Sequence, residues 1–457
     1  MTLRRAQRLP KNNRGAALLA ALLVAGALAI VLTSYVAMCY TSLKMSTLSA
    51  NSGHSAELAE TGMEEALWAL HNNDWTGWST SGTSKTKILN ASSGYTFSYD
   101  GAATGSVSLT ISNYDGTTGS RTVTSTGTIT LSDGTTQNRT LASTSSPAPL
   151  FVNAIAATGN STTTYPGRVR FKSGGLVDSY DSTVTTAPVS GSGFSAVVAS
   201  KSDLTSAQTS TGTVQLTSAT IDGYVAVMPG SAGLYSGASA VLHGTSVIGN
   251  PKVDTSRISS SPYQPIFDVI TPSGAMTALT GGSQTLGTAG ATSPTYYYYT
   301  GDLYLGDNSG IPTVLTVNGP VVLVISGYLA TEDTSKIQVR SGGSVTIFVG
   351  GGLWLDGNGI ENQTLLPKNV AVLAQTGNSS QFEFTTGTPF YGVLYAPNSL
   401  FNFYNYGVNP TIFGSIVGQQ VVFNSSCSPT FHYDTSLRNV SFAGIDTPFA
   451  VNNLSEQ

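Results

Sequence analysis

The longest hydrophobic stretch of the chain lies close to its N-terminus. Residues 15–40 form a run of 26 positions without a charged side chain. As an α-helix, this run would span about 39 Å, which exceeds the ~30 Å hydrocarbon core of a bilayer. Basic residues are concentrated on its N-terminal side, and no acidic residue occurs in positions 1–40. The pattern predicts a single-pass transmembrane helix, with residues 1–14 as a basic cytoplasmic leader.

The helical pattern continues beyond this run. Between residues 55 and 70, apolar side chains recur at helical spacing, and four glutamates fall mostly on the opposite side. The apolar positions are Ala56, Ala59, Met63, Ala66, Leu67 and Leu70. We therefore expect residues 15–72 to form a transmembrane helix that continues into an amphipathic stem.

Residues 73–146 change to a period of two. Val107, Leu109 and Ile111 alternate with Ser and Thr, which is typical of a strand with one buried face. Three Asp-Gly pairs separate such segments and favour tight hairpin turns, namely Asp100-Gly101, Asp115-Gly116 and Asp133-Gly134. This region is expected to form a small antiparallel sheet that buries its apolar face on the stem.

Short apolar strands then recur at intervals of 21–25 residues. The clearest begin at positions 321, 345, 370, 391 and 414. Such a period suits one coil of a parallel β-helix, in which neighbouring coils must stack to bury their apolar faces. The pattern predicts a β-solenoid over residues 147–440, with an irregular linker near 257–295, and a C-terminal tail over 441–457. The predicted fold class is mainly β, with one N-terminal helix.

Composition narrows the range of functions. Only 10% of residues are charged and 50 are Gly, which favours short strands and many turns. The formal net charge is −4, although five of the 20 basic residues lie in the first 14 positions. The remainder is therefore acidic, which disfavours nucleic-acid binding. The two cysteines, Cys39 and Cys427, are too few for a disulfide framework, and Cys39 lies at the end of the predicted membrane segment.

The N-terminal segments resemble a known family. Arg14-Gly-Ala-Ala-Leu-Leu-Ala-Ala-Leu-Leu23 and Ala56-Glu-Leu-Ala-Glu-Thr-Gly-Met-Glu-Glu-Ala-Leu67 are similar to the N-terminal region of PilX-type minor pilins of type IV pilus systems. The resemblance implies a pilin-like stem and sheet, and cleavage by a prepilin peptidase between Gly15 and Ala16. It also implies that other pilins or pilus assembly proteins are partners. One position departs from the pattern of most major pilins, because the fifth mature residue is Ala20 where they have Glu. The alternative is a plain signal-anchor helix.

The β-rich region resembles uncharacterised β-solenoid domains that are attached to PilX-like N-termini. The matching stretches are 177–182, 390–397, 414–418 and 431–434. No chemistry is assigned to those domains, so the resemblance implies architecture and placement only.

Two groups of side chains are candidates for surface contact with an acidic glycan or a partner pilin. Arg168, Arg170 and Lys172 alternate with apolar residues and therefore share one strand face, for which a solvated outer face is the favoured alternative. Tyr296, Tyr297, Tyr298 and Tyr299 form the second group. In a strand, two of these rings must face outward, where they suit sugar or protein contact. Packing at the edge of the core is the alternative.

Metal and catalytic sites have weaker signals. No cofactor is expected, although Asp356, Asn358 and Glu361 supply the oxygen ligands and glycine turns that calcium favours, as do Asp302 and Asp307. Ordinary β-helix corners use the same residue types.

Catalysis by a β-helix enzyme would need acids about one coil apart. Asp178 and Asp181 are candidates, but in a strand they would face opposite sides. His432-Tyr433-Asp434 has acid–base groups without an evident nucleophile nearby.

Taken together, these patterns predict a bacterial, non-enzymatic, minor-pilin-like protein for filament assembly or adhesion. We expect it in the inner membrane through residues 15–40, and then in the periplasm or at the cell surface on a type IV pilus or pseudopilus. The alternative is a membrane-anchored β-helix polysaccharide lyase or hydrolase.

Overall fold

The structure is a computed structural model. It describes residues 13–72, 74–99, 103–113, 121–147, 149–244, 252–272, 275–280, 282–307, 311–404, 409–440, 442 and 449–456. The chain divides into two compact units. Unit 1 comprises residues 1–116, 120–146 and 451–457, and residues 147–450 make up nearly all of unit 2. Most of the predicted leader, and the turns at 100–101 and 115–116, lie outside the described residues.

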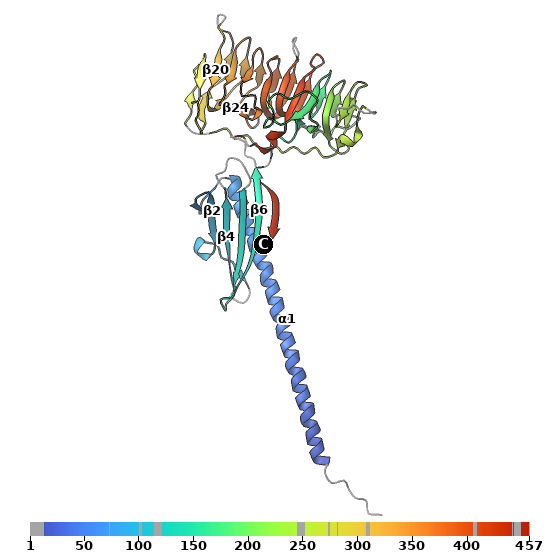
Figure 1. Ribbon diagram of the computed structural model, residues 1–457, viewed down its shortest axis with the longest axis vertical. Helices are drawn as coiled ribbons and strands as arrows, with labels where there is room; N and C mark the ends of the chain where they lie inside the picture. The colour runs from blue at the N-terminus through green and yellow to red at the C-terminus, as the bar shows by residue number, and fades with distance from the viewer. Residues whose placement is uncertain are drawn as a thin grey trace, which may run out of the picture. The chain divides into compact units, whose positions relative to one another are not determined.

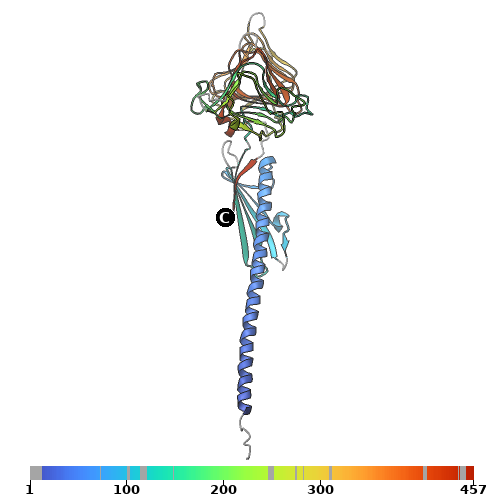
Figure 2. The same cartoon turned by 90° about the vertical axis from the view of Figure 1, so that its right-hand side faces the viewer.

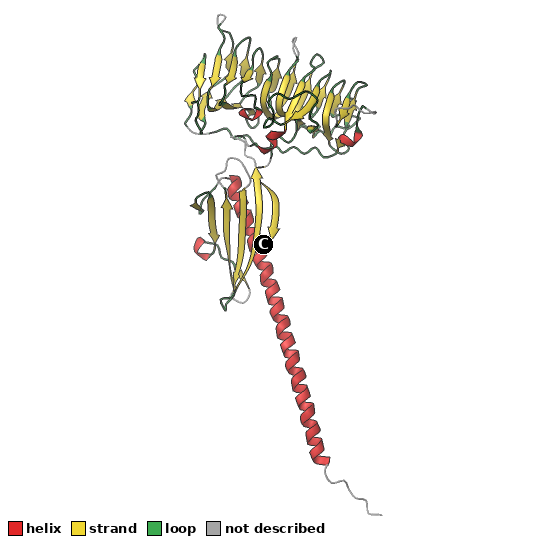
Figure 3. Ribbon diagram, in the orientation of Figure 1, coloured by secondary structure: helices red, strands yellow, loops and turns green. Residues whose placement is uncertain are grey.

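Unit 1 consists of one long helix and a sheet (Figures 1 and 3). Helix α1 runs without interruption over Asn13–Asn72, which confirms the predicted continuous helix. The sheet has the order β1-β2-β4-β5-β6-β32, with β3 paired to β4, and its pairs among β1–β6 are antiparallel. Its strands are β1 (Ser79–Ser81), β2 (Ser84–Leu89), β3 (Ser98–Tyr99), β4 (Ala103–Ser112), β5 (Arg121–Thr130), β6 (Thr136–Pro147) and β32 (Phe449–Glu456), and η1 (Ala91–Ser93) is a short 3₁₀ turn.

The sheet buries its apolar face on the C-terminal half of α1, as expected. Val107, Leu109 and Ile129 are fully buried and pack with Leu58 of the helix. The buried helical stripe differs slightly from the predicted one, because Ala56 and Leu67 are half-buried. It is formed by Ser55, Leu58, Ala59, Gly62, Met63, Ala66, Ala69 and Leu70. Ser55 and Gly62 belong to it because close helix–sheet packing selects for small size, a property that an apolar pattern does not reveal.

The predicted C-terminal tail is a strand instead. β32 pairs with β6 and completes the sheet of unit 1, so unit 2 is inserted in the chain between two neighbouring strands. The physical reason is that β6 would otherwise be an edge strand with a row of unpaired N–H and C=O groups. The sequence pattern does not predict this strand, because Asn452-Asn453 interrupts its apolar residues.

Deleting residues 449–457 should therefore expose the outer edge of β6. We expect the β6 amides that face β32 to exchange with deuterium as fast as exposed amides, because pairing protects backbone N–H groups. Hydrogen-exchange mass spectrometry of the full chain and the truncated chain measures this, and amides of the central strand β4 provide the internal control. Equal protection of β6 in both chains would show that β32 does not pair with it in solution.

Unit 2 is built from parallel strands in three walls, which are seen end-on in Figure 2. In wall A, successive strands pair in the order β16, β18, β21, β24, β27, β29, β30, β7, β10, β12 and β15. These strands span Thr277–Ala278, Thr295–Tyr299, Pro320–Ile325, Ser344–Val349, Val370–Ala374, Phe390–Phe403, Thr411–Phe423, Ile155–Ala157, Ala196–Ser200, Thr220–Val227 and Ile258–Ser259, respectively. The predicted parallel pairing of the strands near 321, 345, 370, 391 and 414 is confirmed.

Walls B and C repeat the same parallel arrangement. Wall B has the order β19, β22, β25, β28, the ends of β29 and β30, β8, β11 and β13. Its own strands are β19 (Leu303–Leu305), β22 (Leu329–Thr331), β25 (Leu353–Leu355), β28 (Gln381–Phe384), β8 (Val169–Phe171), β11 (Val214–Leu216) and β13 (Leu234–Ser236). Wall C contains β17 (Gln284–Leu286), β20 (Val314–Val317), β23 (Lys336–Val339), β26 (Ile360–Asn362), β31 (Thr430–Asp434), β9 (Leu176–Tyr180) and β14 (Val241–His243). The remaining 3₁₀ turns are η3 (Thr255–Arg257), η4 (Pro367–Asn369) and η5 (Thr435–Asn439).

The order of strands in space differs from their order in the chain. The first strand of unit 2, β7, lies between β30 and β10, so the chain enters the stack in its middle. From there it builds toward β15, crosses to the opposite end at β16, and builds back to β30. The colours of Figure 1 follow this path, with green beside red at the centre and yellow at one end.

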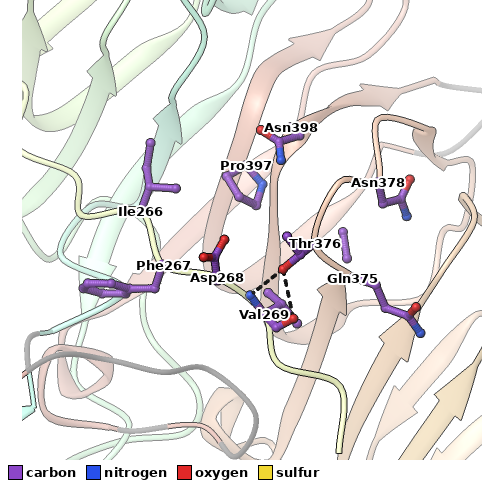
Figure 4. Close-up of a pocket in the computed structure, with 10 residues that line it drawn as sticks. Ile266, Phe267, Asp268, Val269, Gln375, Thr376, Asn378, Pro397 and Asn398 are labelled. Carbon is purple, nitrogen blue, oxygen red and sulfur yellow. Dashed lines mark hydrogen bonds between the residues drawn. The ribbon is translucent and has the colours of Figure 1, made fainter. Parts of the chain in front are cut away.

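A segment outside the stack connects β15, at one end of the stack, to β16 at the other end. Residues 260–272, here called the strap, run along the outer face of wall A (Figure 4). The hydroxyl of Tyr395 donates to the carbonyl of Phe267 at 2.9 Å, and Thr376 bonds both the N–H and the carbonyl of Val269 at 3.0 Å. A cavity of about 40 Å³ lies between the strap and the strand ends. The predicted irregular linker is therefore shorter than 257–295, because β16, β17 and β18 already belong to the stack.

Two apolar layers hold unit 2 together. The interior layer is formed by the inward residues of all three walls, including Ile347. The outer layer includes Phe348 and lies on the outer face of wall A, where the strap residue Val269 contributes to it. Both neighbours, Ile347 and Phe348, are thus fully buried, although strand alternation alone predicts that only one of them faces the core.

Candidate functional site

The N-terminal half of α1 exposes an unbroken apolar surface. The large side chains from Leu18 to Leu48 are all exposed, with Leu22 at 68% and Met38 at 72%. Between residues 15 and 53, Lys44 is the only Lys, Arg, Asp or Glu. Water disfavours so large an apolar surface, so this half of the helix needs lipid or another apolar helix around it.

Four hydroxyl side chains of this half are satisfied within the helix. Thr33, Ser34, Thr41 and Thr47 each donate a hydrogen bond to the carbonyl four residues earlier, at 2.7–3.0 Å. Internal satisfaction of this kind is what the hydrocarbon phase requires. By length and composition, α1 is able to cross a membrane.

The predicted processing site lies at the start of this helix. Gly15 and Ala16 fall within the helical backbone of α1, and the Ala16 side chain lies outside the description. Cys39 is exposed on the same helix, whereas Cys427 is buried in unit 2 and both are free thiols. Burial raises the pKa of the Cys427 thiol to about 12, which makes it unreactive.

The three cations on β8 share the outer face of wall B. Arg168 donates to the carbonyl of Gly212 and to Thr211, Arg170 donates to Gln215 at 3.0 Å, and Lys172 donates to Asn424 at 2.9 Å. Burial, and secondarily the neighbouring Arg170, lower the pKa of Arg168 to about 10. Their hydrogen bonds join neighbouring strands, so these cations have a structural role in wall B.

The four consecutive tyrosines form β18 at one end of wall A. Tyr297 and Tyr299 pack against the interior layer, and Tyr296 packs against the outer layer. Tyr298 is the most exposed of the four, at 40%. The tetrad is therefore mainly a packing element.

The calcium candidates are engaged in turns and an ion pair. The carboxylate of Asp356 accepts from the N–H of Gly357 at 2.8 Å, and Asn358 donates to the carbonyl of Thr334 at 3.1 Å. Glu361 lies 2.6 Å from the ammonium of Lys336. Asp302 and Asp307 likewise accept hydrogen bonds at turns. Within the described ranges, no group of three or more His, Cys, Asp or Glu is arranged to hold a metal ion.

The Lys336–Glu361 pair predicts a pH dependence. Burial alone would raise the pKa of Glu361, but hydrogen bonds from Lys336, Gln363 and Gln338 outweigh it and lower the pKa from 4.5 to about 2. A carboxyl with a lowered folded-state pKa stabilises the fold above pH 4.5, and this contribution is lost as the pH falls toward 2. Glu361→Gln should therefore cost about 1 kcal/mol at pH 7 and much less near pH 2. Thermal unfolding at both pH values measures the difference, and a cost that is independent of pH would contradict the assignment.

His432 and Asp178 come together across wall C. Their strands, β31 and β9, pair directly, and Nδ1 of His432 lies 2.6 Å from Oδ1 of Asp178. The second oxygen of Asp178 accepts from the N–H of Gly191 at 2.6 Å. Both side chains are buried, so solvent and a polymeric substrate have no access to this pair.

A second pair lies beside the first. The register of β9, β12 and β14 aligns Asp178 with Asp222 and Asp222 with His243, whose Nε2 lies 2.8 Å from Oδ1 of Asp222. Burial raises the pKa of Asp222; His243 opposes this effect and Asp178 adds to it. Sequence reasoning missed Asp222 and His243, because only the strand register brings these distant residues into one His–Asp–Asp–His row.

The other catalytic candidates have local structural roles. Asp181 caps a turn by accepting from the N–H of Thr183 at 2.9 Å. The carboxylate of Asp434 accepts from the N–H of Ser182 at 3.0 Å, and the buried Tyr433 hydroxyl donates to the carbonyl of Phe151 at 2.8 Å. Asp178 and Asp181 therefore do not share a site.

One family model and one solved structure are similar to this chain. The family model described as "Domain of unknown function (DUF7305)" matches residues 265–440, which is less than half of the chain and lies within unit 2. No curated protein matches. Among solved structures, the chain is similar to the competence-associated pilin ComZ from Thermus thermophilus, with 13% identity over 89% of this chain and 97% of that chain, and a TM-score of 0.20. That score is too low to support an argument about the fold.

Proposed function

We propose that this protein is a minor-pilin-like subunit, of PilX type, that presents a parallel β-solenoid on a type IV pilus or pseudopilus. Residues 15–40 hold it in the bacterial inner membrane before assembly, with the N-terminus in the cytoplasm and both folded units outside. Its role is filament assembly or adhesion, and the mechanism is display rather than catalysis.

The division of α1 into two halves carries this proposal. The N-terminal half is apolar and exposed, and the C-terminal half is buried against an antiparallel sheet. A helix of this kind can reside in lipid through one half and then pack against the same halves of neighbouring subunits. This is the arrangement that the resemblance to minor pilins implies.

The solenoid assignment is supported by the strand pairing of unit 2. Three walls of parallel strands share one interior apolar layer, and each wall contains successive strands of the winding chain. A stack of coils buries apolar faces that no single coil can bury alone. Both connections of the solenoid to unit 1 lead to neighbouring strands, β6 and β32.

Removal of the leader is the direct test of the pilin assignment. We expect the mature protein to begin at Ala16 and Gly15→Leu to abolish cleavage, because the resemblance places a prepilin peptidase site there. Mass spectrometry of the mature N-terminus, with Gly26→Leu as the matched control further along the helix, measures this. An intact Met1 in assembled protein would contradict the pilin assignment but would leave the membrane anchor intact.

The proposed position in the filament is the tip. The resemblance implies that a fifth-position Glu offsets the charged N-terminal amine of a neighbouring subunit, and this chain has Ala20 there. An unpaired charge in an apolar filament core is costly, whereas a subunit with none ahead of it has no such amine to satisfy. Unit 2 is also large, so a single copy at the filament tip is accommodated more easily than repeated copies along the shaft.

The alternative, a polysaccharide lyase or hydrolase, would need accessible acids. The His–Asp–Asp–His row is the nearest approach to such a site, but its side chains are at most 12% exposed. This burial supports a structural role for the row, and therefore display rather than catalysis.

A further inference from the structure

Three aromatic rings are exposed together on wall B. Tyr304 is 53% exposed, Tyr328 48% and Trp354 38%. They belong to consecutive strands, β19, β22 with its preceding residue, and β25. Single exposed rings are common, but a group of Tyr and Trp rings on one face indicates a contact surface.

The strand register places these rings in a fixed pattern. Leu303, Leu329 and Leu353 are paired and face the core, so the next residues, Tyr304, Ala330 and Trp354, form one outward row. Neighbouring strands are about 4.8 Å apart, which separates the Tyr304 and Trp354 positions by about 10 Å along the wall. The small Ala330 occupies the position between them in this row.

Tyr328 lies beside this row. The residues next to it in the following coil are glycines, which have no side chains. Its ring lies against Gly351 and Gly352, where a Cβ atom at either position would overlap it. The glycines leave room for the ring to lie along the wall. Together, the three residues form a platform, here called the aromatic row.

The charges around the aromatic row have one sign. The wall B segments 302–307, 328–332, 352–356 and 381–385 contain Asp302, Asp307, Glu332, Asp356 and Glu383 but no Lys or Arg. Carboxylates accept hydrogen bonds and repel anions. A nucleic acid or an acidic polysaccharide is therefore a poor fit, whereas a neutral ligand with many hydroxyl donors fits well.

We propose that the aromatic row binds a neutral saccharide chain. A pyranose ring has an apolar C–H face that can stack on Tyr304 or Trp354, and hydroxyls at its rim that can donate to Glu383 and the other carboxylates. Two rings separated along one wall can hold two sugar units of the same chain. This deepens the proposed display role by naming a ligand class, although binding itself does not depend on filament assembly.

The test uses the full chain in lipid nanodiscs. The probes are neutral gluco-, manno-, galacto-, xylo- and chito-hexaoses, with titration calorimetry on each. We expect at least one to bind, and Tyr304→Ala and Trp354→Ala each to weaken binding about tenfold, as the loss of one stacking contact predicts. Tyr235→Ala is the matched control, because Tyr235 occupies the same outward position on wall B with 41% exposure but lies six strands from Trp354.

Each outcome decides the proposal. Failure of the wild type to bind any hexaose, or equal binding by the aromatic variants and the wild type, would overturn it. Binding of choline or oligolysine that the same substitutions abolish would identify a cation site instead. An unchanged thermal unfolding midpoint would verify that the Tyr304→Ala and Trp354→Ala variants fold. Trp354→Gln provides a second variant at this position. A negative result leaves processing at Gly15 unaffected, so it is distinguishable from failure of the proposed function.

Discussion

Replacing Gly62 by leucine should destabilise unit 1 by about 3 kcal/mol. Gly62 lies where α1 packs directly on the sheet, and a Cβ there would overlap Ser125, Val107 and Leu109. On the opposite side of this contact, a Cβ at Gly127 would overlap the backbone of Ser55. Because the helix and the sheet are in close contact at Gly62, a leucine side chain at this position would force them apart.

Gly53→Leu is the matched control for this prediction. Gly53 belongs to the same helix, but a Cβ at this position would have nothing within 4 Å of it. Leucine has a higher helix propensity than glycine, so this variant should be up to ~0.8 kcal/mol more stable. In a Trp354→Phe background, the remaining three tryptophans all belong to unit 1, and their fluorescence follows its unfolding. Effects of the same sign at both glycines would contradict the close packing.

The second large effect is expected in the core of unit 2. Ile347 is fully buried in the interior layer, between Leu323 and Val372 on the neighbouring strands. Ile347→Lys would bury an unpaired charge and should cost about 4 kcal/mol or more. Because the interior layer is shared by all three walls, we expect loss of protease resistance throughout unit 2.

Thr346→Lys is the control on the same strand. Thr346 is only half-buried and points away from the interior layer, so its lysine can reach solvent. Pulse proteolysis in increasing urea should give nearly the wild-type midpoint for Thr346→Lys and a much lower one for Ile347→Lys. Similar midpoints for the two variants, or a lower one for Thr346→Lys, would contradict the assignment of Ile347 to the inward face of β24 and Thr346 to the outward face.

Local patterns were sufficient to predict several elements. The uncharged run and the helical spacing after it identified α1, because both depend only on neighbouring residues. The recurring Val- and Ile-rich segments identified parallel pairing, since each coil repeats the same inward positions. Alternation on 107, 109 and 111 likewise located the buried face of β4.

Non-local features were not predictable in the same way. The spatial order of the coils depends on pairing between strands that are distant in the chain. The first strand of unit 2, β7, pairs with β10 on one side and with β30 on the other. Phe348 is buried in the outer apolar layer, to which distant segments such as the strap contribute, and strand alternation does not reveal that layer. β32 returns to unit 1 after about 300 residues, and no local signal marks its partner β6.

Candidate sites were the least predictable, because they depend on register between distant strands. Asp178 and His432 are 254 positions apart in the chain but only 2.6 Å apart in space. The aromatic row did have a signal, since Leu-Tyr-Leu at 303–305 and Leu-Trp-Leu at 353–355 are two coils apart. The tyrosine tetrad at 296–299 is more conspicuous in the sequence, yet three of its rings pack against the interior or outer apolar layer.

The central claim is that this protein is assembled into a surface filament. Immunogold labelling of sheared filaments, with an antibody raised against unit 2, tests it most directly. We expect label at filament ends, because the proposed tip position rests on Ala20 at the fifth mature position and on the size of unit 2. Label confined to cell membranes would contradict assembly, and label along the whole shaft would contradict the tip position.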